Sequence, residues 1–425
     1  MSKFAASDKW YFSFLPAGIA NGSTSLLIAL FAKELGANVG QVGLIAAASS
    51  LASVPAYMLW GNLSDRMKRR KIFVMAGFLG MAVCLFLMGI SSDIPNYFIA
   101  NLLFGFLSAA SAPVATVLVI EMAAQENWAK RIALFSQVGG TGWVAGLALG
   151  AIWLQFGFFN TTLNEDMRIL FMMGTGLSLL SVLLAWKWIQ EPENKISDRP
   201  LHPPEHHFIT VERLKYIPQR MVHVFYLRAY IRHPHKFNRT LHAYLLCIFL
   251  LFAGFTAFYA FFPIFLIEEV GLPSSHIFLV YIASQFTSVI SYTKVGRWVI
   301  QKGSKKTQLL GSVARAILFP SFLAVALLDL PIIATLAIII VLHAMVGLCW
   351  ALINVSGSMI VSNLAPENVR GHAFGAYNAM QGFGSIGGPV IGGLVCQFFG
   401  YPAGFLCASG FVLAGIVVLL RLKAV

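Results

Sequence analysis

The sequence predicts an all-α integral membrane protein with twelve transmembrane helices in two pseudo-symmetric six-helix bundles. Of its 425 residues, 58% are hydrophobic and 11% are charged, and the mean hydropathy is +0.76. A soluble domain usually carries about 25% charged residues, so this chain cannot cover its own surface with solvated side chains. The composition therefore excludes soluble enzymes, nucleic-acid-binding proteins and secreted disulfide-rich domains.

Twelve apolar stretches are long enough to cross a bilayer, which takes about 20 mostly apolar residues in a helix. The breaks between them carry glycine, proline, asparagine or charged residues. The first six stretches are 10–31, 42–60, 72–90, 97–122, 132–156 and 169–189. The second six are 241–267, 277–299, 309–328, 332–361, 374–398 and 404–422.

The basic residues predict the orientation of these stretches. With both termini placed in the cytoplasm, 27 of the 30 lysines and arginines fall in inner segments. The outer loops then hold only Lys33 and Arg168, against seven acidic residues. Because basic residues concentrate in cytoplasmic loops, we expect a multi-pass plasma-membrane protein with both termini cytoplasmic.

A hydrophilic segment, 191–238, separates an N-terminal half (1–190) from a C-terminal half (239–425). From Pro218 onward its apolar residues recur near one helical face and arginines flank them. This pattern is typical of an amphipathic helix on the inner leaflet, or of a linker helix packed on the bundle. The linker is basic and rich in histidine, but its histidines fit no standard metal site. We therefore expect no metal and no cofactor.

The two halves repeat each other. Asn101 precedes Gly105 by four residues, and His343 precedes Gly347 in the same way, 242 positions later. Glycines at four-residue spacing share this offset and predict close helix packing or bending. The bending candidates are Gly142, Gly146, Gly384, Gly388 and Pro389. Internal duplication of a six-helix unit is the organisation of secondary transporters.

The connection between the second and third stretches reads Gly61-Asn62-Leu63-Ser64-Asp65-Arg66-Met67-Lys68-Arg69-Arg70-Lys71. It resembles the signature loop of the major facilitator superfamily, Gly-x-Leu-Ala-Asp-Arg-x-Gly-Arg-Arg, with Lys68 in place of the second glycine. The resemblance covers essentially the whole chain and implies two six-helix halves around a central cavity. Two family patterns are altered, because Asn101 replaces an arginine and Leu147 replaces a proline after Gly146. Both departures argue against classical proton antiport.

The resemblance also implies a cytoplasmic gate. Asp65 is expected to brace the eleventh helix near Arg370, while Arg66 and Arg70 pair with Glu121. These contacts are expected only when the two halves meet on the cytoplasmic side. The alternative is a topology determinant with solvated charges. The predicted gating residues are Gly61, Asp65, Arg66, Arg70 and Glu121.

The predicted cavity is aromatic and polar but lacks acidic residues, since no Asp or Glu lies in the middle of any stretch. The resemblance also places Arg315 on a peripheral helix, so its side chain is expected to snorkel toward the inner headgroups. His343 is the candidate for proton binding, and a hydrogen-bonded packing role is its alternative. The predicted cavity residues are Asn21, Asn101, Gln137, Trp143, Tyr259, Gln285, Trp350, Asn354, Asn378 and Gln381.

These features predict a secondary active or facilitative transmembrane transporter that works by alternating access and is not an enzyme. The expected substrate is a neutral or amphipathic small organic molecule, with a proton as the candidate coupling ion. The aromatic chamber favours export over uptake. The expected surroundings are the lipid bilayer, with no nucleic-acid partner, and the chain is expected to be a monomer. The alternative is a non-transporting membrane sensor on a transporter fold, which only the His-rich linker favours.

Overall fold

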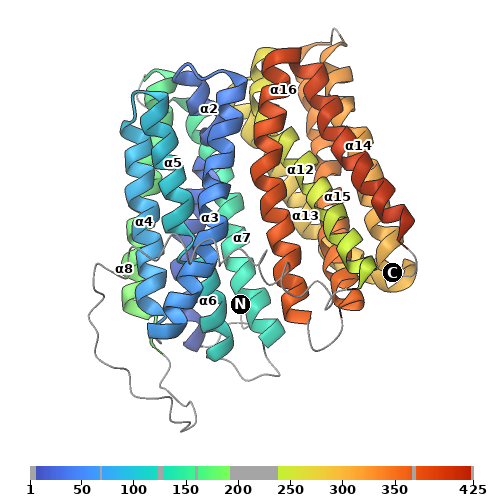
Figure 1. Ribbon diagram of the computed structural model, residues 1–425. Helices are drawn as coiled ribbons and strands as arrows, with labels where there is room; N and C mark the ends of the chain where they lie inside the picture. The colour runs from blue at the N-terminus through green and yellow to red at the C-terminus, as the bar shows by residue number, and fades with distance from the viewer. Residues whose placement is uncertain are drawn as a thin grey trace.

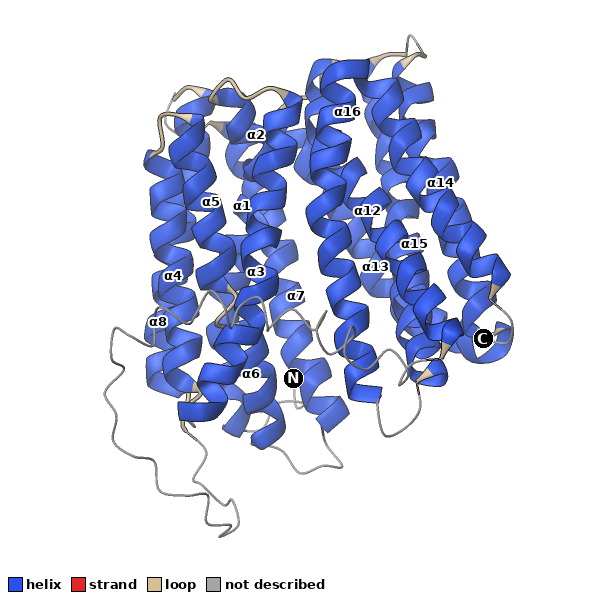
Figure 2. Cartoon of the chain, in the orientation of Figure 1, coloured by secondary structure: helices blue, strands red, loops and turns tan. Residues whose placement is uncertain are grey.

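The computed structural model describes residues 6–67, 69–122, 128–157, 161–191, 238–328, 330–365 and 370–422. Within these ranges the regular structure is helical, with no strand (Figure 2). The helices stand side by side in two groups, one from each half of the sequence (Figure 1). The predicted amphipathic helix and the histidines of the linker lie outside the described residues.

The first half makes six crossings. The first is bent by 43° at a short break and consists of η1 (Ala6–Ser13), α1 (Phe14–Thr24) and α2 (Leu27–Glu34). The others are α3 (Val39–Met67), α4 (Lys71–Ile90), the successive pair α5 (Ile94–Ser108) and α6 (Ala112–Glu121), α7 (Trp128–Phe156) and α8 (Leu163–Trp188).

The second half repeats this arrangement with α12 (Arg239–Glu268), α13 (Ser274–Lys302), α14 (Ser304–Ala326), α15 (Ile332–Leu364) and α16 (Arg370–Arg421). α16 supplies the last two crossings, because its backbone leaves helical geometry at Gly400, where φ is 80°. A φ in this range favours glycine. The predicted break between the last two stretches therefore lies at this residue.

Nine described helices are long and apolar enough to span a membrane, or ten when the bent α1–α2 pair is included. Of these helices, α16 supplies two crossings. The helix α13 is not among the helices that are long and apolar enough. The five serines of α13 are all buried in the bundle, so their polarity is directed away from lipid. The predicted all-α fold with twelve crossings is confirmed.

Local sequence signals fix several helix starts. The Asp93 carboxylate accepts the backbone N–H of Asn96 at 2.8 Å and caps α5. Thr162 and Glu165 form a reciprocal capping box at the start of α8. Asn238 caps α12 by accepting a backbone N–H from its first turn. Such caps satisfy backbone donors that a helix start leaves without partners.

The bundle has two distinct ends. α8 ends and α12 begins on the same side (Figure 1), which we call the linker end. The two parts of α16, whose backbone leaves helical geometry at Gly400, meet at the opposite side, which we call the far end (Figure 1). Large apolar side chains such as Ile300, Leu327 and Ile333 are exposed on the outside of the bundle. A surface of this kind is solvated by lipid rather than by water.

The predicted bending glycines lie where helices pack closely. A Cβ atom on Gly146 of α7 would lie 2.1 Å from the carbonyl oxygen of Ile19 on α1. A Cβ atom on Gly388 of α16 would lie 2.4 Å from the carbonyl oxygen of Ala253 on α12. Gly142 and Gly384 have similarly close backbone neighbours. Close packing is thus their observed role, and bending at these glycines and Pro389 stays a prediction.

Candidate functional site

The far end is closed by contacts between the two halves. Lys33 at the end of α2 forms an ion pair with Glu268 at the end of α12. The Tyr401 hydroxyl donates a second hydrogen bond to the Glu268 carboxylate. The hydroxyl of Ser275 on α13 donates to the Gln155 side chain of α7 at 2.8 Å. Two separate helix pairs therefore join the halves at this end.

A close backbone approach lies beside these polar contacts. A Cβ atom on Gly43 of α3 would lie 2.3 Å from the carbonyl oxygen of Pro389 on α16. A Cβ atom on Gly393 would lie 3.0 Å from the Cα atom of Gly43. Only residues without a side chain allow two helices to approach this closely. Closure of the far end thus depends on glycine at these positions.

The linker end is open between the halves. A groove of about 680 Å³ runs between α3 and α6 of the first half and α12 and α16 of the second. Gly61, Gly140 and Gly375 have open space where a Cβ atom would point. No ion pair between two described residues joins the halves at this end. The protein is therefore closed at the far end and open at the linker end.

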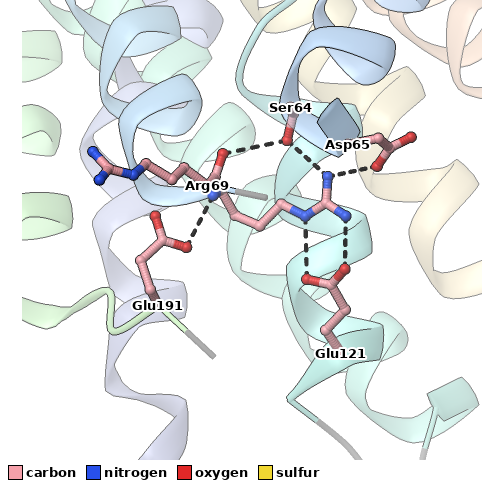
Figure 3. A network of polar contacts seen from close by, with 6 residues as sticks. Ser64, Asp65, Arg69, Glu121 and Glu191 are labelled. Carbon is pink, nitrogen blue, oxygen red and sulfur yellow. Dashed lines mark hydrogen bonds and ion pairs between the residues drawn. The ribbon is translucent and has the colours of Figure 1, made fainter. Parts of the chain in front are cut away.

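Three of the five predicted gating residues, Asp65, Arg70 and Glu121, meet in a polar cluster at the linker end of the first half (Figure 3). The Arg70 guanidinium donates to both carboxylate oxygens of Glu121, at 2.7 and 3.1 Å. Its third nitrogen donates to the Ser64 hydroxyl at 2.8 Å and to the Asp65 carboxylate at 2.6 Å. The Arg70 side chain is only 9% exposed. The cluster thus fastens the ends of α3 and α6 to the start of α4.

Glu191 completes this cluster, and the prediction of the gate did not include it. Its carboxylate accepts the backbone N–H groups of Arg70 and Lys71, each at 2.9 Å. A carboxylate at a helix N-terminus satisfies free donors and the helix dipole together. Its place directly after the sixth span, opposite a basic helix start, is the sequence signal that points to it.

One part of the gate prediction is wrong. The Arg70–Glu121 pair was expected only when the halves meet on the cytoplasmic side, but it lies wholly within the first half and exists while the linker end is open. Asp65 likewise contacts Arg70 of its own half, and its side chain is 62% exposed. The side chains of Arg66 and Arg370 lie outside the described residues.

A central cavity of about 380 Å³ lies deeper between the halves. Four of the predicted cavity residues, Trp143, Tyr259, Gln285 and Trp350, line it. The predicted residues Asn378 and Gln381 instead line the linker-end groove. Both also border a smaller pocket of about 160 Å³, together with Trp350 and the predicted residue Asn354. Asn21 and Gln137 line none of these three pockets.

The structure corrects the expectation for Arg315. Its side chain does not snorkel toward the headgroups but is 1% exposed and lines the central cavity. One guanidinium nitrogen donates to the Tyr259 hydroxyl at 3.0 Å. The guanidinium carbon lies 4.1 Å from the centre of the Phe255 ring and 5.7 Å from that of Trp350. A buried positive charge thus belongs to this site.

Asn101 and His343 tie equivalent helices together in the two halves. The Asn101 amide donates to the carbonyl oxygen of Ile45 on α3 at 2.6 Å. Nδ1 of His343 lies 3.0 Å from the carbonyl oxygen of Val280 on α13. Because a carbonyl only accepts, Nδ1 must carry the proton in this contact. Asn101 is fully buried in this contact and lies in none of the three pockets, so its predicted place in the cavity is wrong.

His343 also borders the central cavity. Its ring stacks on Phe262 and lies near Tyr281, with ring centres 5.4 and 4.8 Å apart. Its Nε2 atom has no hydrogen-bond partner among the described residues. The ring thus braces α15 against α13 with one nitrogen and leaves the other available.

Two helical halves that enclose a cavity, and that meet at one end and separate at the other, are the architecture of a membrane transporter. Residues 245–424 match the family model described as Major Facilitator Superfamily. Residues 11–194 match the model described as Sugar (and other) transporter. The chain belongs to the major facilitator superfamily and is a multi-pass membrane transporter.

Curated relatives cover nearly the whole chain. Multidrug resistance protein 1 of Bacillus subtilis (strain 168) is 22% identical over 422 residues, which are 97% of this chain and 94% of that protein. Multidrug resistance protein MdtG of Salmonella paratyphi A is 22% identical over 87% of this chain and 82% of that protein. None of the relatives named here supports the sensor alternative.

Solved structures share the fold. The crystal structure of the nucleoside transporter NupG matches with a TM-score of 0.76 at 16% identity, over 98% of each chain. A bacterial homologue of the human lysosomal transporter Spinster, in an inward-facing and unoccupied conformation, matches with a TM-score of 0.66 at 12% identity. That match covers 98% of this chain and 95% of the other.

Proposed function

We propose that the protein exports a small amphipathic organic molecule by alternating access across the plasma membrane. The observation that carries this proposal is the difference between the two ends of the protein. The halves are joined at the far end and separated by a groove at the linker end. In this proposal a substrate passes from the groove to the central cavity beside the smaller pocket, which shares Phe252 with the groove and Trp350 with the cavity. Release on the other side requires the far-end contacts to open and the groove to close.

The walls of the path and the names of the relatives favour export over uptake. The groove and the central cavity are lined mainly by apolar and aromatic side chains with a few amides and hydroxyls, and the central cavity also contains Arg315 and His343. Such walls suit amphipathic molecules that partition into the membrane and its inner face. The names of the curated relatives, multidrug resistance proteins, favour export as well. One chain supplies both halves of the cavity, so we propose that it works as a monomer.

The test is transport in inside-out vesicles that contain the purified protein. Ethidium, rhodamine 123 and 2-naphthoate are suitable probes, since they are amphipathic and differ in charge. We expect energised vesicles to accumulate at least one probe, and vesicles without the protein to accumulate none. A protein that moves none of these probes, and no other amphipath in a wider screen, would not be an exporter of this class.

The orientation proposal places the linker end in the cytoplasm. In a variant without the five native cysteines, Ser92→Cys lies beside the far-end start of α5, and Ser197→Cys lies in the linker. A membrane-impermeant maleimide added to intact cells should label Ser92→Cys and leave Ser197→Cys unlabelled. Permeabilised cells should label both positions. Equal labelling in intact cells would contradict the twelve-crossing orientation.

His343 is proposed as the proton-binding group. His343→Asn gives the second half the residue that the first half has at the equivalent position, so the bond to Val280 is kept while the titratable ring is lost. We expect loss of accumulation driven by a pH gradient, with downhill exchange of the probe retained. Flux in proteoliposomes, with and without an imposed gradient, measures both. Full gradient-driven accumulation in the variant would exclude His343 as the essential carrier.

A further inference from the structure

Arg315 carries a positive charge and lies at the middle of α14, far from both ends of that helix. Its side chain is 1% exposed and points between α12 and α15 into the central cavity. A charge at this depth is expensive in a membrane and usually serves a function. Arg315 is not part of the cluster at the linker end.

The guanidinium is only partly satisfied. Nη2 donates to the Tyr259 hydroxyl, and aromatic rings of Phe255, Phe319 and Trp350 surround the rest of the group. Nε and Nη1 have no hydrogen-bond partner among the described residues. Rings stabilise a cation through their faces, but they cannot accept these two N–H groups as a carboxylate would.

The described residues provide no counter-charge. Every acidic side chain among them lies near a helix end or in a connection, and none lines the central cavity. The other basic group on the cavity wall is His343, whose Nε2 also has no partner. A buried charge is normally paired. Among the described residues, the positive charge of Arg315 therefore has no negative partner in the cavity.

We propose that the central cavity binds the anionic head group of an amphipathic organic substrate, with Arg315 as its counter-charge. The unpaired Nε and Nη1 lie on opposite edges of the guanidinium, each beside Nη2, so one carboxylate oxygen can accept from either of them while the second oxygen accepts from Nη2. Trp350, Tyr281 and Trp143 form the walls for an apolar, preferably aromatic, body. The cavity volume of about 380 Å³ lies in the range of small-molecule sites. This inference rests on the proposed export function and narrows its amphipathic substrate to an anionic one.

The test compares ligands of one shape and different charge on the purified full-length protein. 2-Naphthoate, 2-naphthamide and 2-naphthylmethylammonium share their ring system, and acetate supplies the head group alone. Isothermal titration should show 2-naphthoate binding at least about ten-fold more tightly than the amide, with no detectable binding of the ammonium ion or of acetate. Equal affinity for naphthoate and naphthamide would overturn the proposal, and so would a preference for the ammonium ion.

Variants separate recognition from structural support. Arg315→Gln should abolish the preference for naphthoate over naphthamide, and Arg315→Lys should retain part of it. Arg168→Gln is the matched control, because Arg168 is also helix-borne but donates to Asn164 and to the Gly89 carbonyl, outside the cavity. The control should keep the naphthoate preference.

Thermal unfolding without ligand gives an independent readout. Removal of a charge that lacks a counter-charge should leave the unfolding temperature of Arg315→Gln unchanged or raised, whereas Arg168→Gln should lower it. Arg315 would be a structural residue if Arg315→Gln lost stability markedly but kept the preference for naphthoate, as Arg315→Lys and Arg168→Gln did. Vesicles that export ethidium but show no anion preference would overturn this inference and leave the export proposal standing.

Discussion

Glu121→Ala is expected to destabilise the protein and to lower transport several-fold through a smaller amount of folded protein. The substitution removes both carboxylate contacts of Arg70, whose side chain is almost buried and keeps only Ser64 and Asp65 as side-chain partners. Hydrogen bonds to charged groups contribute about 1.5–3 kcal/mol, and Glu121 itself is 32% exposed, so we expect a loss of about 1–2 kcal/mol.

Arg69→Ala is the matched control for this prediction. Arg69 is the chain neighbour of Arg70, but its side chain is exposed and extends away from the cluster (Figure 3). Thermal unfolding in detergent and probe flux in vesicles should distinguish the two variants, with Arg69→Ala close to the unaltered protein. If Glu121→Ala behaved like Arg69→Ala in both measurements, the cluster would only mark the topology of the loop.

Gly43→Val is expected to abolish transport by preventing closure of the far end. Its Cβ atom would lie 2.3 Å from the Pro389 carbonyl oxygen, a backbone atom that cannot move aside like a flexible side chain. Overpacking of this kind costs about 1–3 kcal/mol. Because the clash exists only when the halves meet at the far end, the cost falls on the state described here and shifts the population toward the opposite one.

The control for this variant is Gly40→Ala, one turn earlier on α3. Its Cβ atom would meet neighbours at 3.4 Å or more, which is near ordinary contact. A cysteine at Ala29 in the central cavity reports access from the far end through its labelling rate. We expect faster labelling in Gly43→Val and no change in Gly40→Ala. Unaltered labelling and transport in Gly43→Val would show that the far-end contact is not a moving interface.

The sequence predicted the crossings well because spanning a bilayer imposes a length and an apolar composition on each one. It also predicted the partner of Arg70, since opposite charges at neighbouring helix ends on one side of the membrane have few other partners. It did not predict that this pair persists while the linker end is open. That property depends on which helices move together, and a single sequence carries no signal for it.

The errors among the predicted cavity residues arise because the sequence does not show which face of a helix is turned toward the cavity. α14 is apolar on most sides, so nothing in its pattern shows which face is turned inward. Because the resemblance places this helix at the periphery, the Arg315 side chain was predicted to reach the headgroups, although it enters the cavity between α12 and α15. The same ambiguity placed Asn101 in the cavity, whereas its amide bonds the backbone of α3.

Alternating access is tested most directly by distances between spin labels at both ends of the protein in lipid nanodiscs. One pair, Asn62 and Asn363, spans the halves at the linker end, and another, Glu34 and Glu269, spans them at the far end; all four residues are exposed. The account predicts reciprocal changes: in Gly43→Val the far-end distance should lengthen while the linker-end distance shortens, relative to the unaltered protein. Distances that stay fixed at both ends, or a far end that opens while the linker end remains open, would contradict alternating access.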